Sequence, residues 1–151
     1  MALESLLKEI YFFKSFTDAE LNKLVPLVVR EKFSSGHTIF HEGQEAQALY
    51  LVEIGTVKIF KETEKSYVTS IGKGGTFGEM AFLDGGKRSA TATTAEETHL
   101  IEIPYSKLSA ILVQDSELAV KFFETAAKYM SRRLRATTED LKKAKELIRH
   151  F

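Results

Sequence analysis

Cysteine and tryptophan are absent from this 151-residue chain, and proline occurs only twice. Without cysteine the chain can form neither a disulfide nor a cysteine-held iron–sulfur cluster, and it has no thiol nucleophile. It also has no excess of one charge, because 21 basic residues balance 21 acidic ones. A neutral balance provides no basic field to attract nucleic acid or an anionic membrane.

Long apolar runs are missing as well. No segment approaches the length of a membrane span, and residues 1–4 do not open a signal-peptide pattern. Hydrophobic residues make up 44% and charged residues 28% of the chain, which is typical of a soluble globular protein. We therefore expect one cytoplasmic domain covering residues 1–151, long enough to bury a core.

The first zone, residues 1–30, has a helical pattern. Residues 17–20 (Thr-Asp-Ala-Glu) form a capping box, in which the threonine and the glutamate each satisfy a free backbone N–H. Pro26 follows within the same pattern, so the helix must kink or break there. This zone is predicted to consist of N-terminal helices.

The second zone, residues 31–104, is rich in short β-type runs separated by glycine-containing turns. The predicted strands are residues 38–41, 48–52, 56–60, 67–71, 90–94 and 99–103. Many short strands at this spacing are typical of a barrel, a sandwich or a jelly roll.

The third zone, residues 105–151, is helical again. Tyr105 opens a short helix, and Asp115 or Ser116 caps a longer one. No glycine or proline follows, which allows about 36 residues of helix, about 54 Å long.

An apolar seam runs along this last helix at alternating spacings of three and four residues. Its members are Val120, Phe123, Ala127, Met130, Leu134, Thr137, Leu141, Ala144, Ile148 and Phe151. A sustained heptad seam favours a partner helix, so we expect a parallel homodimer through it. The alternative is one helix packed on its own domain with a frayed end.

Residues 77–91 combine features that suit one phosphate and one sugar hydroxyl. Gly78 and Glu79 stand at the start of a short helical turn, and Arg88 with Ser89 follows a Gly-Gly break. Helix starts collect anions through free N–H groups, and an arginine fork matches phosphate oxygens. A carboxylate would repel phosphate, so its role there is to accept a ribose hydroxyl.

The same segment resembles the phosphate-binding cassette of cyclic nucleotide-binding domains. This family includes bacterial catabolite activators, protein kinase A regulatory subunits and cyclic-nucleotide-gated channels. Residues 77–83 read F-G-E-M-A-F-L and residues 88–91 read R-S-A-T, which match the family pattern at every fixed position. The turn glycines Gly36, Gly43 and Gly55 also fall where the family has them. The resemblance implies an α+β fold: a jelly-roll-like β-roll (a double-stranded β-helix) with N-terminal helices, a short cassette helix and a long C-terminal helix.

The resemblance also implies the ligand contacts of the cassette. Gly78 lets the backbone approach the ligand, Glu79 accepts from the ribose 2′-hydroxyl, and Arg88 binds the exocyclic phosphate oxygens. Backbone N–H groups of the cassette point at the phosphate or the sugar, and one residue adds its hydroxyl. These further contacts are Met80, Ala81 and Ser89.

In the activator branch of the family, two neighbouring hydroxyl residues after an R-R-L motif touch the adenine, one from each subunit. Thr137 and Thr138 hold the corresponding places here. This chain carries about one helical turn more between Tyr105 and Met130, so base contact and a simple interfacial position stay open. The expected ligand is cAMP in preference to cGMP, although Ser89 is compatible with either base.

Other classes of function are less well supported. A cupin-type metal enzyme needs clustered ligands. His37 and His41 are four apart and could share a strand face, so these two and the adjacent Glu42 are the available candidates. No arrangement for acid–base or nucleophilic catalysis stands out, so we expect no catalysis and no metal.

Transcription factors of the family carry a helix-turn-helix after the long helix. None follows here before Phe151, so direct DNA binding is not expected. The expected function is therefore a stand-alone sensor that signals through its last helix or an effector protein. A piece of a larger cyclic-nucleotide-regulated transcription regulator, kinase or channel is the alternative.

Overall fold

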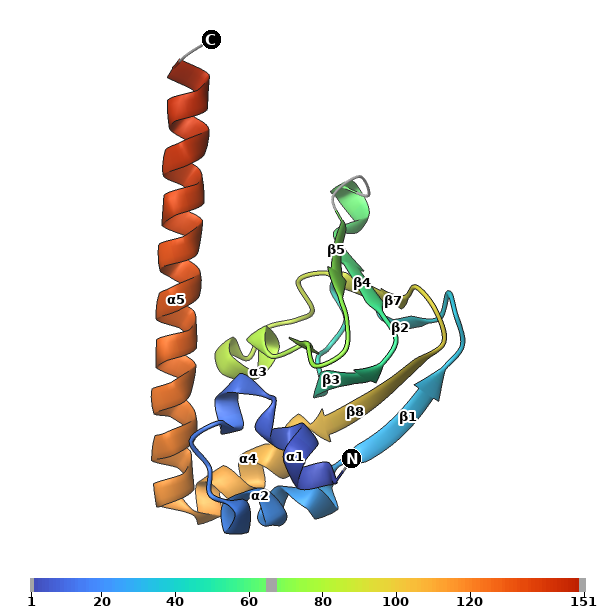
Figure 1. The fold of residues 1–151 in the computed structure, drawn as a ribbon, viewed down its shortest axis with the longest axis vertical. Helices are drawn as coiled ribbons and strands as arrows, with labels where there is room; N and C mark the ends of the chain where they lie inside the picture. The colour runs from blue at the N-terminus through green and yellow to red at the C-terminus, as the bar shows by residue number, and fades with distance from the viewer. Residues whose placement is uncertain (1, 65–67, 150–151) are drawn as a thin grey trace.

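The computed structural model describes residues 2–64 and 68–149. Figure 1 shows a β-roll with helices packed on one side and a last helix, α5 (Ser116–Arg149), that extends past both. This is the predicted α+β architecture, with N-terminal helices, a short helix α3 (Met80–Asp84) in the cassette and a long C-terminal helix.

The N-terminal region contains α1 (Leu3–Lys8), the 3-10 helix η1 (Tyr11–Phe13), α2 (Asp18–Leu24) and the 3-10 helix η2 (Val25–Leu27). The predicted capping box at the start of α2 is confirmed, because Thr17 Oγ1 accepts from the Glu20 N–H at 3.2 Å and the Glu20 carboxylate accepts from the Thr17 N–H at 2.9 Å. The predicted break is confirmed too, since α2 ends before Pro26 and η2 replaces it.

The β-roll is made of two four-stranded antiparallel sheets. One sheet has the order β1 (Val29–Phe33), β8 (Thr98–Pro104), β3 (Ala48–Ile54), β6 (Thr76–Phe77). The other has the order β2 (Thr38–Phe40), β7 (Thr91–Thr94), β4 (Val57–Phe60), β5 (Val68–Ile71), and a 3-10 helix η3 (Glu62–Glu64) follows β4.

The six predicted strands are present, and their described boundaries shift by at most two residues. For the strand predicted at residues 67–71, the first residue, Tyr67, lies outside the described residues. Two strands were not predicted. β1 starts at Val29, inside the zone assigned to helices, because its backbone pairs with β8 along the whole strand. β6 has only two residues, too few to show alternation.

Strand β3 explains how the core is divided. Leu49 and Leu51 face the helices, where they join a core cluster with the N-terminal helices, α4 (Tyr105–Gln114) and α5. Ala48, Tyr50 and Val52 face the other way, into the interior of the roll. A strand buried on both faces reads as a continuous apolar run, which is why residues 48–52 lack alternation.

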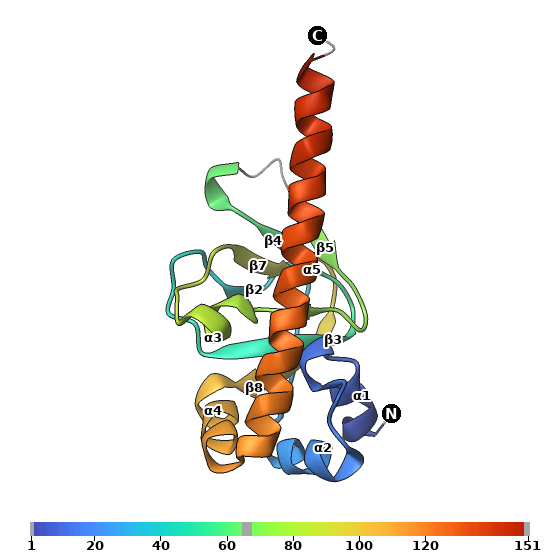
Figure 2. The ribbon, with the colours of Figure 1, turned by 90° about the vertical axis from the view of Figure 1, so that its left-hand side faces the viewer.

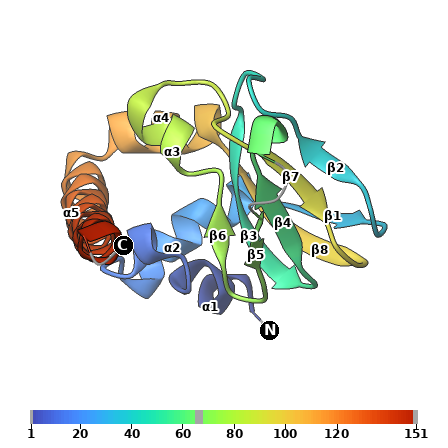
Figure 3. The same cartoon turned by 90° about the horizontal axis from the view of Figure 1, so that it is seen from above.

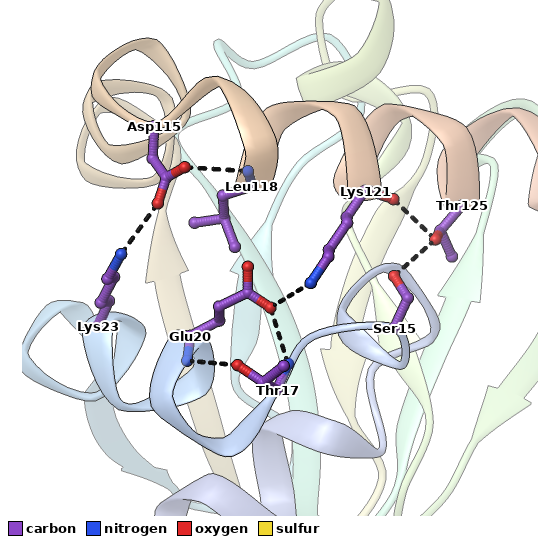
Figure 4. A network of polar contacts seen from close by, with 8 residues as sticks. All are labelled: Ser15, Thr17, Glu20, Lys23, Asp115, Leu118, Lys121 and Thr125. Atoms are coloured by element: carbon purple, nitrogen blue, oxygen red, sulfur yellow. Dashed lines mark hydrogen bonds and ion pairs between the residues drawn. The ribbon is translucent and has the colours of Figure 1, made fainter.

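Polar contacts tie the N-terminal helices to the first turns of α5 (Figure 4). Asp115 Oδ1 accepts from the Leu118 N–H at 3.1 Å, so Asp115, one of the two predicted candidates, caps α5. Its Oδ2 lies 2.9 Å from Lys23 Nζ. Glu20 Oε1 lies 2.7 Å from Lys121 Nζ one turn further along. The start of α5 is therefore fixed to α2 by charge as well as by apolar packing.

Helix α5 has two faces with different surroundings. Leu118, Phe122 and Ala126 are buried against the domain. The predicted seam points elsewhere, and its members Leu134 and Ile148 are 68% and 72% exposed. From residue 131 to residue 149 every α5 side chain is exposed. Figures 1 and 3 show α5 set apart from the strands, and Figure 2 shows its last turns rising above them. Phe151, the last predicted seam residue, lies outside the described residues.

None of the helices in the described parts of the chain combines the length and the apolar character needed to cross a bilayer.

Candidate functional site

A cavity of about 420 Å³ lies between the second sheet, the cassette and α5. The six cassette residues predicted as ligand contacts all line it: Gly78, Glu79, Met80, Ala81, Arg88 and Ser89. Its other walls come from β4 and β5 through Ile59 and Thr69, and from α5 through Tyr129 and Arg133. The structure thus brings residues that are far apart in the sequence to one cavity.

Thr137 and Thr138 do not line this cavity. Both are exposed on α5, and Thr138 Oγ1 donates to the Leu134 carbonyl oxygen at 2.8 Å. Within one chain, therefore, the structure does not bring the two predicted base contacts to the other six residues.

The local backbone of the cassette is set by two glycines. Gly78 has φ +80° between β6 and α3, and Gly85 ends α3 with φ +70°. Both values lie in the left-handed region, where glycine has no steric penalty. The short helix between them presents Glu79 at its N-terminus and leads the chain back to Arg88.

Arg88 is a buried cation, with only 6% of its surface exposed. Its Nη1 donates to the Gly78 carbonyl oxygen at 3.1 Å, and its Nη2 donates to the Ala48 carbonyl oxygen at 2.6 Å. The guanidinium carbon also lies 4.0 Å from the centre of the Phe40 ring. Among the described residues no carboxylate forms an ion pair with Arg88, and its buried Nε has no hydrogen-bond partner.

A guanidinium stays protonated at any ordinary pH. Carbonyl dipoles and an aromatic face stabilise the Arg88 charge without neutralising it. A buried charge without a counterion is costly, so the site is suited to bind a compact anion.

Glu79 is the second buried charge of the site, also 6% exposed. Its Oε1 accepts from Tyr129 Oη at 2.9 Å and lies 3.4 Å from Arg133 Nη1. Its Oε2 forms no hydrogen bond with the described residues, which leaves acceptor capacity for a hydroxyl of a ligand.

Sequence reasoning missed three polar residues that complete the site: Tyr105, Tyr129 and Arg133. Tyr105, the first residue of α4, donates its hydroxyl proton to the Gly78 carbonyl oxygen and accepts from Arg88 Nη1 at 3.1 Å. Burial raises the pKa of Tyr105, and the nearby Arg88 charge partly opposes the shift. Tyr105 thus links the cassette backbone and its arginine to α4.

A signal for the α5 residues did exist in the sequence. Leu118, Phe122, Ala126 and Tyr129 are spaced four, four and three residues apart, which is a second helical face beside the seam. The end of that face points at the cassette.

His37 and His41, the histidines considered as metal ligands, each contact a different side chain. The His37 ring packs 4.9 Å from the Phe33 ring, and His41 Nδ1 lies 3.1 Å from Glu62 Oε1. Across residues 2–64 and 68–149, no three histidine or acidic side chains gather as metal ligands would.

Comparison with known families decides which kind of site this is. The model of the family described as "Cyclic nucleotide-binding domain" matches residues 30–115, more than half of the chain. The chain belongs to the cyclic nucleotide-binding domain family. The domains of this family are typically regulatory and not catalytic.

Two curated relatives are different kinds of protein, a receptor protein and a kinase regulatory subunit. The cyclic AMP receptor protein of Thermus thermophilus is 34% identical over 94 residues, which are 60% of this chain and 44% of that protein. The cAMP-dependent protein kinase regulatory subunit of Neurospora crassa is 29% identical over 109 residues, 72% of this chain and 28% of that protein. The chain therefore spans less than half the length of these two relatives.

The fold agrees with the sequence comparison. The crystal structure of the Thermus thermophilus catabolite activator protein has a TM-score of 0.73 and 29% identity, covering 87% of this chain and 61% of that one. The similarity to cyclic nucleotide-binding domains thus extends beyond residues 30–115 to the helices on both sides.

Proposed function

We propose that residues 1–151 form one cyclic nucleotide-binding domain that binds cAMP, in preference to cGMP, as a regulatory sensor. The observation that carries this proposal is the pairing of two buried groups in one cavity. Arg88 is a cation without a counterion among the described residues, and Glu79 is a carboxylate with one oxygen that accepts no hydrogen bond from them. A cyclic nucleotide offers one anionic phosphate and one 2′-hydroxyl, which match these two groups.

In this proposal each cassette residue has one task. Arg88 binds the exocyclic phosphate oxygens, and Ser89 adds its hydroxyl and N–H. The backbone N–H groups of Met80 and Ala81 face the phosphate or sugar, and Gly78 permits the close approach. All of these residues line the cavity, which supports the assignment.

The preference for cAMP rests on the relatives. Both curated proteins described above carry cAMP or cyclic AMP in their names. Titration with both nucleotides, described below, tests this preference directly.

We also propose that two copies pair through the exposed seam of α5. Its apolar members face solvent in the single chain, with Val120 63% and Leu141 55% exposed. A partner helix would cover them. Thr137 is itself a seam member, so in a dimer Thr137 and Thr138 would lie next to the second chain. They could then contact the base of a nucleotide bound in the cavity of their own chain or of the partner chain.

Signal output would then pass through α5 or through an effector protein. Glu79 in the cassette and Tyr129 in α5 already touch, so the ligand site and the seam helix are in direct contact. The same role would hold within a larger cyclic-nucleotide-regulated protein. The proposal requires no metal, no catalysis and no contact with nucleic acid.

Titration calorimetry of the purified chain with cAMP and with cGMP tests the proposal. We expect saturable binding of at least one of them, with cAMP the tighter. Arg88→Ala should weaken binding about thirtyfold or more, as expected for loss of a buried charge pair. Arg88→Lys keeps the charge and loses the planar guanidinium, so its affinity should lie between that of the parent and that of Arg88→Ala.

Arg30→Ala is the matched control, because Arg30 is a half-exposed arginine paired with Glu53 outside the cavity. Its affinity should equal that of the parent. Thermal melting of each variant separates loss of the site from loss of the fold. A folded parent that binds neither nucleotide, or a folded Arg88→Ala that binds as well as the parent, contradicts the proposal.

A further inference from the structure

Tyr129 extends from α5 to the cassette and contacts its only buried carboxylate among the described residues. Its hydroxyl donates to Glu79 Oε1 at 2.9 Å, a normal length for a strong hydrogen bond. Glu79 is 6% exposed, so little water can replace this donor. The Tyr129 hydroxyl therefore contributes to where the Glu79 carboxylate points.

The ring of Tyr129 is held in turn by the N-terminal 3-10 helix. Its centroid lies 5.5 Å from that of Tyr11 and 5.0 Å from that of Phe12, the latter in an edge-on arrangement. Such aromatic contacts have preferred geometries and fix the ring. Burial and the Glu79 charge raise the pKa of Tyr129, so its hydroxyl keeps its proton and can donate.

Arg133 is a weaker candidate for the same task. Its Nη1 lies 3.4 Å from Glu79 Oε1, longer than a good charge-assisted hydrogen bond. Its side chain is 53% exposed, so water screens the interaction. Nη1 also donates to Tyr129 Oη at 3.1 Å, so Arg133 supports the tyrosine as well as the glutamate.

Both contacts engage Oε1, and Oε2 makes no hydrogen bond with the described residues. The carboxylate is therefore anchored by one oxygen and offers the other to the cavity. An anchored carboxylate binds a hydroxyl better than a free one, because no rotamer freedom is lost on binding.

We propose that Tyr129 is a positioning residue that fixes Glu79 for the ribose 2′-hydroxyl, and that it thereby sets how strongly the site prefers ribose over 2′-deoxyribose. This inference rests on the proposed function and deepens it. It assigns a sugar-discriminating role to a residue that is remote in sequence from the cassette.

The test compares cAMP with 2′-deoxy-cAMP in the parent and in Tyr129→Phe, which keeps the ring and removes the hydroxyl. In the parent we expect the affinity for cAMP to exceed that for 2′-deoxy-cAMP by about tenfold or more, because a hydrogen bond to a charged group is lost with the 2′-hydroxyl. In Tyr129→Phe the ratio should fall to about threefold or less. The affinity for 2′-deoxy-cAMP should stay unchanged, because that ligand cannot use Glu79.

Tyr11→Phe is the matched control. The Tyr11 hydroxyl is buried without a hydrogen-bond partner in the described structure, and its ring adjoins Tyr129. The same chemical change one ring away from the site should leave the sugar ratio at the parent value.

The outcomes separate the inference from the function on which it rests. A parent that binds neither ligand overturns both. A parent that binds both ligands equally retains the nucleotide site and overturns the Glu79 contact with its positioning residue. If Tyr129→Phe weakens both ligands by the same factor, or leaves the sugar ratio unchanged, the hydroxyl has only a structural role and the inference is wrong.

Discussion

Gly78 and Arg88 lie so close that no side chain fits between them: a Cβ on Gly78 would stand 2.8 Å from Arg88 Nη1. Gly78 also has φ +80°, where an alanine is strained. Gly78→Ala should therefore both strain the backbone and displace the buried guanidinium. We expect unfolding free energy to fall by about 1–3 kcal/mol in urea titrations and cAMP affinity to fall about tenfold by calorimetry.

Gly36→Ala separates the two causes. Gly36 has nearly the same φ, +79°, but a Cβ there would meet nothing within 4 Å. This variant should lose stability through backbone strain alone and keep the affinity of the parent. Equal affinities for the two variants would show that the close approach of Gly78 to Arg88 does not matter for binding.

The cassette could be predicted from sequence because its chemistry is local. Gly78, Glu79 and Arg88 lie within eleven residues. A turn glycine, an acid and an arginine in that order form a pattern that can be read directly from the sequence. Helical spacing places Tyr129 on the inner face of α5, but it does not place Tyr129 beside Glu79. It reaches Glu79 only because α5 packs along the domain on the side of the cassette, and the path of a helix is a tertiary property that periodicity does not specify.

The secondary structure likewise divides into elements that local sequence predicts and elements that depend on tertiary contacts. The strand at residues 48–52 is evident from its apolar run, and the break at Pro26 from its missing N–H. β1 was missed because Val29–Phe33 contains three charged side chains and no buried residue. Pairing with β8 decides its structure, and local composition gives little sign of that partner.

Phe122 connects the elements around the site. It is fully buried on α5, and its ring lies 5.6 Å from Phe12 in η1 and 5.6 Å from Phe82 in α3. Phe122→Ala should lower the unfolding free energy by about 3–5 kcal/mol, since it leaves a cavity in the core. Chemical denaturation measures this loss.

The neighbouring Phe123 provides the control, because it is 53% exposed and belongs to the seam. Phe123→Ala should leave a monomer almost as stable as the parent monomer, with its effect confined to association. Similar losses for Phe122→Ala and Phe123→Ala at a protein concentration that keeps the chain monomeric would contradict this division of α5 into an inner and an outer face.

Glu102 should make the stability depend on pH. Burial raises its pKa to about 7 from 4.5, and a hydrogen bond to the neighbouring Glu31 acts in the same direction. Between these two values the folded chain holds a proton that the unfolded chain releases, so stability falls as pH rises. The stabilisation that protonated Glu102 contributes is complete below pH 4.5 and is lost as pH rises through about 7.

Glu102→Gln removes this titration, so its unfolding free energy should vary less between about pH 5 and 8 than that of the parent. Glu97→Gln is the control. The pKa of Glu97 is lowered by its hydrogen bond to Lys32, so its titration falls below this window and its slope should match the parent. A parent slope that persists in Glu102→Gln would assign the pH dependence to other groups.

The exposed seam of α5 should mediate association of two chains. Leu134 is 68% exposed in the single chain, and in a seam-to-seam dimer each copy would meet its counterpart. Leu134→Asp would bury two like charges there, at a cost on the order of 3 kcal/mol, which is about a hundredfold weaker association. Ala136→Asp adds the same charge to an exposed α5 position outside the seam and should leave association unchanged. Sedimentation equilibrium distinguishes the variants. A parent that stays monomeric at millimolar concentration, or equal effects of the two aspartates, would exclude pairing through this seam.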